Sequence, residues 1–249
     1  MNLPELRKLL AALTQDSVYA HTAYFAGGCV RDYASAELFA KQLSSAMPND
    51  VDITVELPNG GIRLAEFLLP HFPEATFSTH HAFGTAKLQM QDYCLEFVGT
   101  RKENYLPHSR YPQISLGSLL EDIMRRDFSI NALLMRIDSG ELIDICGKGL
   151  SDLRNGIIRS LGVPKNKFRE DPLRMLRALR FSLRFGFAFE ETTLAALISE
   201  AKLLDTLSTR RIKHEISLML HHSDASGIRA SFTRLGWQDN AKLLSLLLD

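Results

Sequence analysis

The spacing of the apolar residues changes near residue 147, and this change constrains the fold more than any other feature. Before it, stretches such as residues 51–56 (Val-Asp-Ile-Thr-Val-Glu) alternate with the period of a strand, between segments of helical spacing. After it, no segment has a clear strand pattern, and apolar residues recur three and four apart. We therefore predict an α+β chain with two domains: a mixed sheet with helices over residues 1–147 and an all-helical domain over residues 148–249.

Individual elements follow from the same periodicities. A strand at residues 24–26 is predicted to turn at Gly27-Gly28 into a helix, and a hairpin is predicted around Gln91-Asp92. Residues 101–118 are predicted to be a loop, because they contain Pro107, Pro112 and Gly117. The predicted helices are 3–13, 62–69, 118–135 (with Met135 entering a strand), 150–154, 171–184, 192–203, 210–220, 228–235 and 240–248.

The composition excludes several classes of protein. With 45% hydrophobic and 23% charged residues in 249, the chain can bury a core and is not predominantly disordered. We expect no membrane partner, because no apolar run reaches the roughly 18 residues that cross a bilayer. The three cysteines, Cys29, Cys94 and Cys146, lie far apart and lack zinc-binding spacing, which predicts reduced thiols and a cytoplasmic location.

The net charge of zero is the sum of two opposite halves. Residues 1–149 carry 13 Lys and Arg against 18 Asp and Glu, whereas residues 150–249 carry 16 against 11. A neutral total therefore does not exclude an RNA partner, because the predicted helical domain is basic.

Two aspartates stand two apart on the predicted strand at residues 51–56. The period of a strand places Asp50 and Asp52 on one face, where their charges repel each other. Glu96 is a lone acid in the apolar segment 95–98 of a predicted strand. Three such carboxylates can hold divalent cations such as Mg²⁺ for phosphoryl transfer. Alternatively, Asp-x-Asp marks the exposed face of an edge strand, and the residues alone favour that interpretation.

The turn at Gly27-Gly28 is a candidate phosphate site. Glycines allow the backbone to approach a phosphate closely, helix-start N–H groups bind anions, and Arg31 adds a forked donor. For two glycines by themselves, an ordinary turn is the better explanation.

A second polar cluster follows the predicted loop. In a helix, Asp127 and Asn131 are four apart and share a face beside Arg126. An arginine for a triphosphate, with an acid and an amide for ribose hydroxyls, is chemically reasonable. A solvated polar helix face is an equally good explanation of the spacing.

The segment from Glu170 to Arg184 is the most basic helix. Asp171 before Pro172 predicts an N-cap with Pro in the first turn. Four arginines (Arg174, Arg177, Arg180 and Arg184) fall within a sector of about 120° beside a leucine stripe, as expected for a nucleotide or RNA contact. The alternatives are that Asp171 is only a cap and that the arginines form a solvated face.

Together, the order of these motifs is specific. The series Gly-Gly-Cys-Val-Arg-Asp, Asp-Val-Asp, Leu-Glu-Phe-Val-Gly-Thr-Arg, Arg-Arg-Asp-Phe-Ser-Ile-Asn-Ala, Lys-Gly-Leu-Ser-Asp-Leu-Arg-Asn-Gly-Ile-Ile-Arg and Glu-Asp-Pro-Leu-Arg-Met-Leu-Arg-Ala-Leu-Arg-Phe resembles the class II tRNA nucleotidyltransferases (CCA-adding enzymes) and their bacterial poly(A) polymerase relatives. The resemblance covers about residues 24–187 and continues weakly through residues 207–212. It implies a palm-like nucleotidyltransferase head domain followed by a helical neck.

The resemblance also implies roles for residues. Asp50 and Asp52 resemble the Mg²⁺ ligands, and Glu96 resembles the third catalytic carboxylate. Residues that resemble triphosphate and ribose contacts are Gly27, Gly28, Arg31, Arg126, Asp127 and Asn131. Residues that resemble the base-reading motif and its further nucleotide contacts are Glu170, Asp171, Arg174, Arg177 and Arg180.

The implied reaction is template-independent addition of CMP and AMP, from CTP and ATP, to the 3′ end of tRNA. Phe83-Gly84-Thr85 resembles the CCA-adding branch, and residues 73–81 are interpreted as a flexible loop that switches the site from C to A. The alternatives are C-only or A-only addition, a poly(A) polymerase, and a non-catalytic nucleotide- or RNA-binding module. The last is disfavoured because all three carboxylates are present.

Relatives of this kind usually carry a further helical body that grips tRNA. We therefore expect either a truncated or minimal enzyme that lacks a C-terminal RNA-binding domain, or a chain whose tRNA is held differently, by a partner or in a homodimer.

Overall fold

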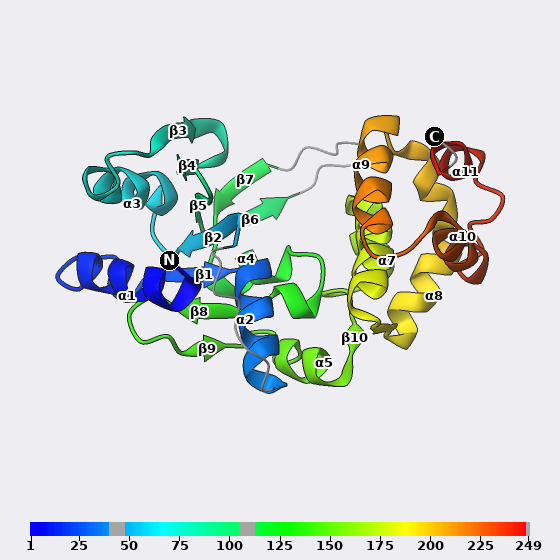
Figure 1. Cartoon of the computed structure of the whole chain (residues 1–249), viewed down its shortest axis with the longest axis horizontal. Helices are drawn as coiled ribbons and strands as arrows, with labels where there is room; N and C mark the ends of the chain where they lie inside the picture. The colour runs from blue at the N-terminus through cyan, green and yellow to red at the C-terminus, as the bar shows by residue number, and fades with distance from the viewer. Residues whose placement is uncertain (40–47, 105–112, 248–249) are drawn as a thin grey trace. The chain divides into compact units, whose positions relative to one another are not determined.

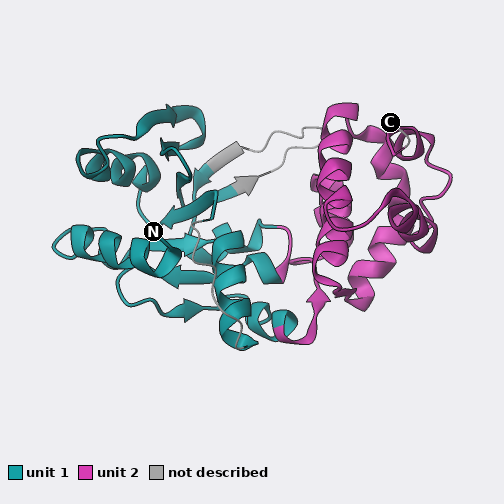
Figure 2. Ribbon diagram, in the orientation of Figure 1, with its two compact units in different colours: residues 1–106, 111–126, 130–153 teal, residues 107–110, 127–129, 154–249 magenta. Residues whose placement is uncertain are grey.

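The computed structural model describes residues 1–39, 48–104 and 113–247 (Figure 1). The chain divides into two compact units (Figure 2). Unit 1 comprises residues 1–106, 111–126 and 130–153, and unit 2 comprises residues 107–110, 127–129 and 154–249. The short segment Asp127–Ser129 therefore belongs to unit 2, although the chain on both sides of it belongs to unit 1. The predicted division after residue 147 stays a prediction.

Unit 1 is built on a mixed sheet of seven strands in the order β3-β4-β5-β2-β1-β8-β9. Strands β2 and β5 are parallel, and the other neighbours are antiparallel. The strands are β1 (Ala23–Ala26), β2 (Asp50–Val55), β3 (Thr76–His80), β4 (Thr85–Gln89), β5 (Cys94–Gly99), β8 (Leu134–Arg136) and β9 (Leu142–Ile143).

The central strands separate an apolar face of the sheet from a polar one. Val51, Ile53 and Val55 of β2 are buried, whereas Asp50 and Asp52 alternate with them and point to the other face. Helix α3 (Gly60–Leu68) packs on the apolar side, because a Cβ on Gly60 would lie 2.7 Å from Val55. This alternation leaves the acidic face of β2 and β5 available for a site.

Further helices and a separate two-stranded antiparallel sheet complete the described part of unit 1. Helix α1 (Leu3–Thr14) begins with a capping box of Asn2 and Glu5 and buries Leu3, Leu6 and Leu10. The other helices are α2 (Gly28–Leu38), α4 (Leu119–Met124) and α5 (Gly149–Asn155), and α5 crosses the boundary at which unit 1 ends. Strand β6 (Arg101–Asn104) pairs with β7 (Gln113–Leu116).

Unit 2 is predominantly helical. Its helices are α6 (Pro164–Glu170), α7 (Leu173–Phe185), α8 (Glu191–Ser199), α9 (Thr209–Leu220), α10 (Ala225–Arg234) and α11 (Ala241–Leu246). Phe128, Phe168, Phe232 and Trp237 fill its core, and the Trp237 indole N–H donates to the Leu197 carbonyl at 3.0 Å. The mixed sheet with helices, followed by a helical part, confirms the predicted α+β class.

Several predicted elements need correction. The helix predicted over 118–135 ends at Met124, and a 3-10 turn (Ser129–Asn131) and strand β8 follow it. The loop predicted at 101–118 contains strands β6 and β7, while residues 105–112 lie outside the described part. Residues 73–81, interpreted as a flexible loop, contain the edge strand β3, which pairs with β4 along its whole length.

The helical part also differs from prediction in three details. Two short strands, β10 (Ile157–Ile158) and β11 (Ala188–Phe189), pair in parallel, and helix α6 had not been predicted. Asp171 lies one residue before the N-cap of α7, which is Pro172. Its carboxylate nevertheless accepts from the Leu173 N–H at 3.2 Å, so it supports the start of the helix.

Over the described residues, no helix combines the length and apolar character needed to cross a membrane. The three cysteines are free thiols, as predicted.

Candidate active site

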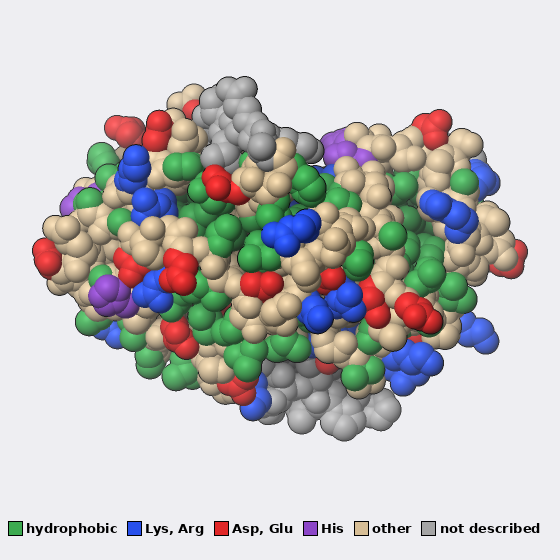
Figure 3. All heavy atoms as spheres, turned by 90° about the horizontal axis from the view of Figure 1, so that it is seen from below, with side chains coloured by type: hydrophobic (Ala, Val, Ile, Leu, Met, Phe, Trp, Pro, Cys, Tyr) green, Lys and Arg blue, Asp and Glu red, His purple; other side chains and the backbone are tan. Residues whose placement is uncertain are grey.

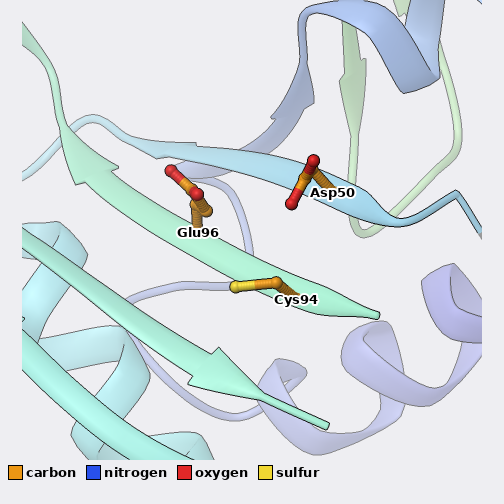
Figure 4. Close-up of side chains that lie close together, drawn as sticks. All are labelled: Asp50, Cys94 and Glu96. Carbon is orange, nitrogen blue, oxygen red and sulfur yellow. The ribbon is translucent and has the colours of Figure 1, made fainter. Parts of the chain in front are cut away.

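The predicted carboxylates meet on the polar face of β2 and β5. The parallel register pairs Asp52 with Glu96 and Asp50 with Cys94. Ligand atoms of Asp50, Cys94 and Glu96 all lie within 4.8 Å of one another (Figure 4). Because residues two apart on a strand share a face, Asp52 projects from the same face as Asp50. The sheet therefore gathers three carboxylates and a thiol.

Asp52 is the most enclosed of the three acids. Burial raises the pKa of Asp52 above its usual value, Arg126 opposes that rise, and the charges of Glu96 and Asp50 add to it. The turn at Gly27, with φ of 72°, lies against this carboxylate: a Cβ on Gly27 would be 2.7 Å from Asp52 Oδ2. Glycine is therefore required here both by the backbone and by the space.

Glu96 forms an ion pair with Lys87, which lies directly across the β4–β5 pair. Both side chains are partly exposed, at 47% for Lys87 and 38% for Glu96. The pKa of Lys87 is raised chiefly by its hydrogen bond to Glu96. The Lys87 ammonium group thus offsets part of the negative charge of the three carboxylates.

Arg126 connects the carboxylates to helix α4. Its Nη2 donates to Thr54 Oγ1 at 3.0 Å and to Asp122 Oδ2 at 3.3 Å. Asp122 is fully buried, accepts two bonds from Arg125 at 2.7 and 2.9 Å, and accepts from the Arg101 backbone N–H at 3.3 Å. Such a fully bonded buried carboxylate fixes the arginine beside the acidic face.

Arg31 is buried and held within unit 1. Its Nη1 donates to Asn131 Oδ1 at 2.7 Å, and its Nε donates to Asp32 Oδ1 at 2.8 Å. The structure thus brings together two predicted nucleotide contacts, Arg31 and Asn131, across 100 residues of sequence.

The predicted pairing of Asp127 with Asn131 on one helix face is wrong, because no continuous helix joins them. Asp127 belongs to unit 2, where its Oδ2 accepts from Arg177 Nε at 2.8 Å and Nη2 at 2.6 Å. Asn131 belongs to unit 1 and accepts from Arg31. The chain changes from one unit to the other between these residues, so they serve different clusters.

The predicted base-reading residues of unit 2 lie at the end of α6 (Glu170), in the link after it (Asp171) and in the first turn of α7 (Arg174), and each has a charged partner. Glu170 Oε2 accepts from Arg174 Nη1 at 2.9 Å and from Lys167 Nζ at 3.2 Å. Both carboxylate oxygens of Asp171 accept from Arg211 Nη2, at 2.8 and 3.1 Å. A carboxylate has about four acceptor positions, so Asp171 can still accept from a ligand.

The arginine stripe of α7 is not simply a solvated face. Arg180 Nε donates to Glu215 Oε2 of α9 at 2.7 Å, and these side chains are 11% and 3% exposed. The guanidinium of Arg180 also lies 4.4 Å from the ring centre of Phe181, and that of Arg184 lies 4.8 Å from the ring centre of Phe185. Acids of α9 and of residues 127–129 therefore organise this stripe.

The structure adds neighbours that the sequence interpretation missed. Pairing of Lys87 with Glu96 follows from the hairpin centred on Gln91-Asp92, so it was available from sequence. Glu215 is an acid among the buried residues of α9 (Ile212, Ile216 and Met219), which is also a readable signal. The remaining missed neighbours, Cys94, Asp122 and Arg211, depend on strand register and tertiary packing.

The geometry of unit 1 is that of a nucleotidyltransferase head domain. The family model described as "Poly A polymerase head domain" matches residues 23–159. That range contains the glycine turn, the three carboxylates and Arg126. The chain belongs to this family.

Individual proteins that the chain resembles in sequence and structure are CCA-adding enzymes. The CCA-adding enzyme of Latilactobacillus sakei is 35% identical over 229 residues, which cover 91% of this chain and 53% of that protein. The Thermotoga maritima CCA-adding enzyme complexed with tRNA is 28% identical, with a TM-score of 0.72 over 94% of this chain and 50% of that one. A CCA-adding enzyme in complex with CTP is also 28% identical, with a TM-score of 0.72 over 93% of this chain and 50% of that one. The chain thus spans about half the length of the relatives it matches.

Proposed function

We propose that this chain adds CMP and AMP, from CTP and ATP, to the 3′ end of tRNA without a nucleic-acid template. The observation that carries the proposal is the acidic face of unit 1, where Asp50, Asp52 and Glu96 gather beside the Gly27 turn. The chain belongs to a nucleotidyltransferase family, and its relatives are CCA-adding enzymes of which one is complexed with tRNA and one with CTP.

The donor set fits Mg²⁺. Asp50, Asp52 and Glu96 offer the carboxylate oxygens that this cation prefers, and a cation would offset both the burial of the Asp52 charge and its repulsion by Glu96 and Asp50, which together raise the pKa of Asp52. The nearby Cys94 thiol is a soft ligand, whereas Mg²⁺ is a hard cation that prefers oxygen, so the carboxylates are the ligands that we propose. When bound, Mg²⁺ supplies charge stabilisation at the phosphate oxygens.

The protein groups of unit 1 are proposed to position the triphosphate. The backbone at Gly27 and Gly28 opens helix α2, whose N–H groups attract an anion. Arg126 adds a positive charge held by Asp122 and Thr54. In the proposed reaction the 3′-oxygen of the RNA attacks the α-phosphorus, the bond from the α-phosphorus to the bridging oxygen breaks, and pyrophosphate leaves.

Base selection is proposed to lie with Asp171 and Arg174 in unit 2. A carboxylate accepts from the exocyclic amine of cytosine or adenine, and a guanidinium donates to the adjacent ring acceptor. Uracil and guanine present a carbonyl at that edge, which would face the carboxylate without a hydrogen bond. Arg211 on Asp171 and Glu170 on Arg174 hold both readers in place. We propose the cytoplasm as the compartment, since the three cysteines are free thiols.

The direct test is incorporation into tRNA that lacks its last three nucleotides. The protein and Mg²⁺ are incubated with each labelled nucleoside triphosphate alone, and then with CTP and ATP together. Discrete addition of C, C and A is expected. Long A tails would indicate a poly(A) polymerase, a single nucleotide type would indicate a C-only or A-only enzyme, and no incorporation would contradict the proposal.

The metal assignment is tested by Asp52→Asn. This substitution preserves the shape of the side chain but removes its charge, so incorporation is expected to fall about a thousandfold. Asp92→Asn is the matched control, because Asp92 is an exposed acid in the turn of the β4–β5 hairpin, and it should keep full activity. Retained activity in Asp52→Asn would overturn the assignment.

A further inference from the structure

The Cys94 thiol belongs to the acidic face of unit 1, but the proposed reaction gives it no role. Cys94 stands directly beside Asp50 in the parallel pair of β5 and β2, and Glu96 follows two residues later on the same face of β5. One ligand atom from each of these three side chains lies within 4.8 Å of the other two (Figure 4). A sulfur atom therefore stands among the oxygen atoms that are proposed to hold Mg²⁺.

These three side chains keep ligand positions that no other described residue uses. Cys94 is 4% exposed, and its thiol forms no hydrogen bond with a described residue. The exposed Asp50 carboxylate also has no hydrogen bond within the described part of the chain. Glu96 accepts from Lys87 through Oε1, which leaves the acceptor positions of Oε2. A buried thiol usually packs as a small apolar group, whereas this one faces two carboxylates, which indicates a shared ligand.

One sulfur and two carboxylate oxygens suit a thiophilic cation. Zn²⁺ binds both kinds of ligand, often through three protein side chains with a fourth position left for water or substrate. In a tetrahedral site such ligand atoms lie about 3.5 Å apart, so small rotations of the Asp50 and Glu96 side chains would close the present cluster around the ion. Mg²⁺ prefers six oxygen ligands and gains little from a thiol. The donor set therefore distinguishes the two cations.

We propose that Asp50, Cys94 and Glu96 form a binding site for Zn²⁺ or a similar thiophilic divalent cation. On binding, the cation replaces the proton of the thiol, which passes to solvent, and the sulfur and the two carboxylates become its ligands. Because Asp50 and Glu96 are also proposed to hold Mg²⁺, the two cations exclude each other, and Zn²⁺ stops nucleotide addition. Only this inhibition rests on the proposed function, since the Zn²⁺ site itself needs no reaction.

The first test detects the sulfur ligand without any reaction. Co²⁺ accepts the same ligands as Zn²⁺ and absorbs in the near ultraviolet when a thiolate binds it. Titration of the metal-free full chain with Co²⁺ is expected to produce this charge-transfer band. Cys94→Ser should remove the band and raise the Kd for Co²⁺, measured by calorimetry, on the order of a hundredfold. Absence of the band in the unsubstituted protein would overturn the proposal.

Two further variants separate this site from binding at any thiol. Cys146→Ser is the matched control, because the Cys146 Sγ donates to Asp144 Oδ1 at 3.2 Å but belongs to no group of three metal ligands among the described residues. It should leave the band unchanged. Asp50→Asn changes an exposed side chain, keeps the thiol, and should raise the Kd for Co²⁺ about tenfold. Loss of the band in Cys146→Ser, or a wild-type Kd in Asp50→Asn, would contradict the assignment.

Incorporation assays test whether the two cations exclude each other. At a fixed Mg²⁺ concentration, Zn²⁺ should inhibit the unsubstituted protein, and EDTA followed by excess Mg²⁺ should restore addition. Each protein is compared with its own rate without Zn²⁺, and half inhibition of Cys94→Ser should require about a hundredfold more Zn²⁺. Equal inhibition of the two proteins would overturn the link between this site and the reaction. If the unsubstituted protein incorporates nothing but gives the Co²⁺ band, the proposed function fails and the Zn²⁺ site stands.

Discussion

Gly27 meets two demands at the start of α2. Its backbone has a φ of 72°, which side chains with a Cβ rarely adopt, and its Cα faces Asp52 so closely that a methyl group would lie 2.7 Å from Oδ2. A turn needed only for chain reversal requires the first property but not the second. The close approach therefore supports a role of this turn in the site.

Gly27→Ala is expected to abolish incorporation, because the new methyl group displaces the Asp52 carboxylate. Gly147→Ala is the matched control: Gly147 has a φ of 66°, but a Cβ there would meet nothing within 4 Å. Both variants should lose about 1 to 2 kcal/mol of unfolding free energy from the backbone. Incorporation by Gly147→Ala should stay near wild type, and equal activity of the two variants would contradict the steric argument.

The cysteines differ strongly in environment. Burial raises the pKa of the Cys29 thiol to about 12, whereas Cys146 is only partly enclosed. The thiolate is the reactive form, and burial raises the pKa of Cys146 as well, so iodoacetamide at pH 8.5 should modify Cys29 on the order of a hundredfold more slowly than Cys146. Mass spectrometry of native and urea-unfolded protein measures the rates. Rapid native labelling of Cys29 would contradict the burial of this thiol.

At the scale of elements, the strands of the site could be predicted but their register could not. Alternation identified β2 and the β4–β5 hairpin and placed Asp50, Asp52 and Glu96 on strands. Only the parallel pairing of β2 with β5 places Glu96 opposite Asp52. Paired residues of these parallel strands, such as Asp52 and Glu96, lie 44 residues apart in sequence, so no local pattern encodes their register.

The helix predicted over 118–135 shows why local periodicity was insufficient. The apolar residues there have helical spacing, but Phe128 turns into the core of unit 2 while Ile130 and Leu133 are buried after the chain returns to unit 1. Tertiary packing thus overrides the helical pattern. Consequently the sequence singled out Asp127 and Asn131 as candidate nucleotide contacts, but it could not show that they belong to different units.

Helices α7 and α9 are joined by the buried pair of Arg180 and Glu215. Glu215→Gln leaves the arginine without its counter-charge and should lower the unfolding free energy by about 3 kcal/mol. The double variant Arg180→Met with Glu215→Leu should recover most of this loss, because apolar side chains need no compensating charge. Urea unfolding followed by the emission of Trp237, which lies in unit 2, measures both.

A matched pair in unit 2 controls for charge alone. Arg169 is 59% exposed and pairs with Glu200, which is 11% exposed, so the arginine stays hydrated without its partner and Glu200→Gln should cost less than Glu215→Gln. If Glu215→Gln cost no more than Glu200→Gln, the Arg180–Glu215 pair would not be a structural contact between the helices.

At the scale of the whole molecule, the charge is divided along the chain rather than concentrated in one basic surface. Residues 1–149 carry an excess of acids and residues 150–249 an excess of bases. On the face drawn in Figure 3, positive and negative side chains are interspersed. Three of the acids gather at the candidate metal site, whereas three arginines of α7 (Arg174, Arg177 and Arg180) are each paired with an acid.

Because Asp127–Ser129 belongs to unit 2, this unit is built from separate parts of the sequence, with residues of unit 1 between them. Phe128 is fully buried and meets the edge of Phe181 at 5.8 Å between ring centres. The Ser129 N–H donates to the Arg159 carbonyl at 2.9 Å, and the Leu161 N–H donates to the Asp127 carbonyl at 3.1 Å. A short segment that precedes the helical part by more than 20 residues thus completes its core.

Removing this segment should therefore weaken unit 2 more than its length suggests. Phe128→Ala in the full chain is expected to lower the unfolding free energy reported by Trp237 by about 3 to 5 kcal/mol, the usual cost of truncating a buried phenylalanine. The fragment 148–249, which lacks Phe128 and both backbone hydrogen bonds, should unfold at still lower urea. If the fragment unfolded at the same urea concentration as the full chain, residues 127–129 would not be part of the core of unit 2, and the predicted division after residue 147 would also describe how the chain folds.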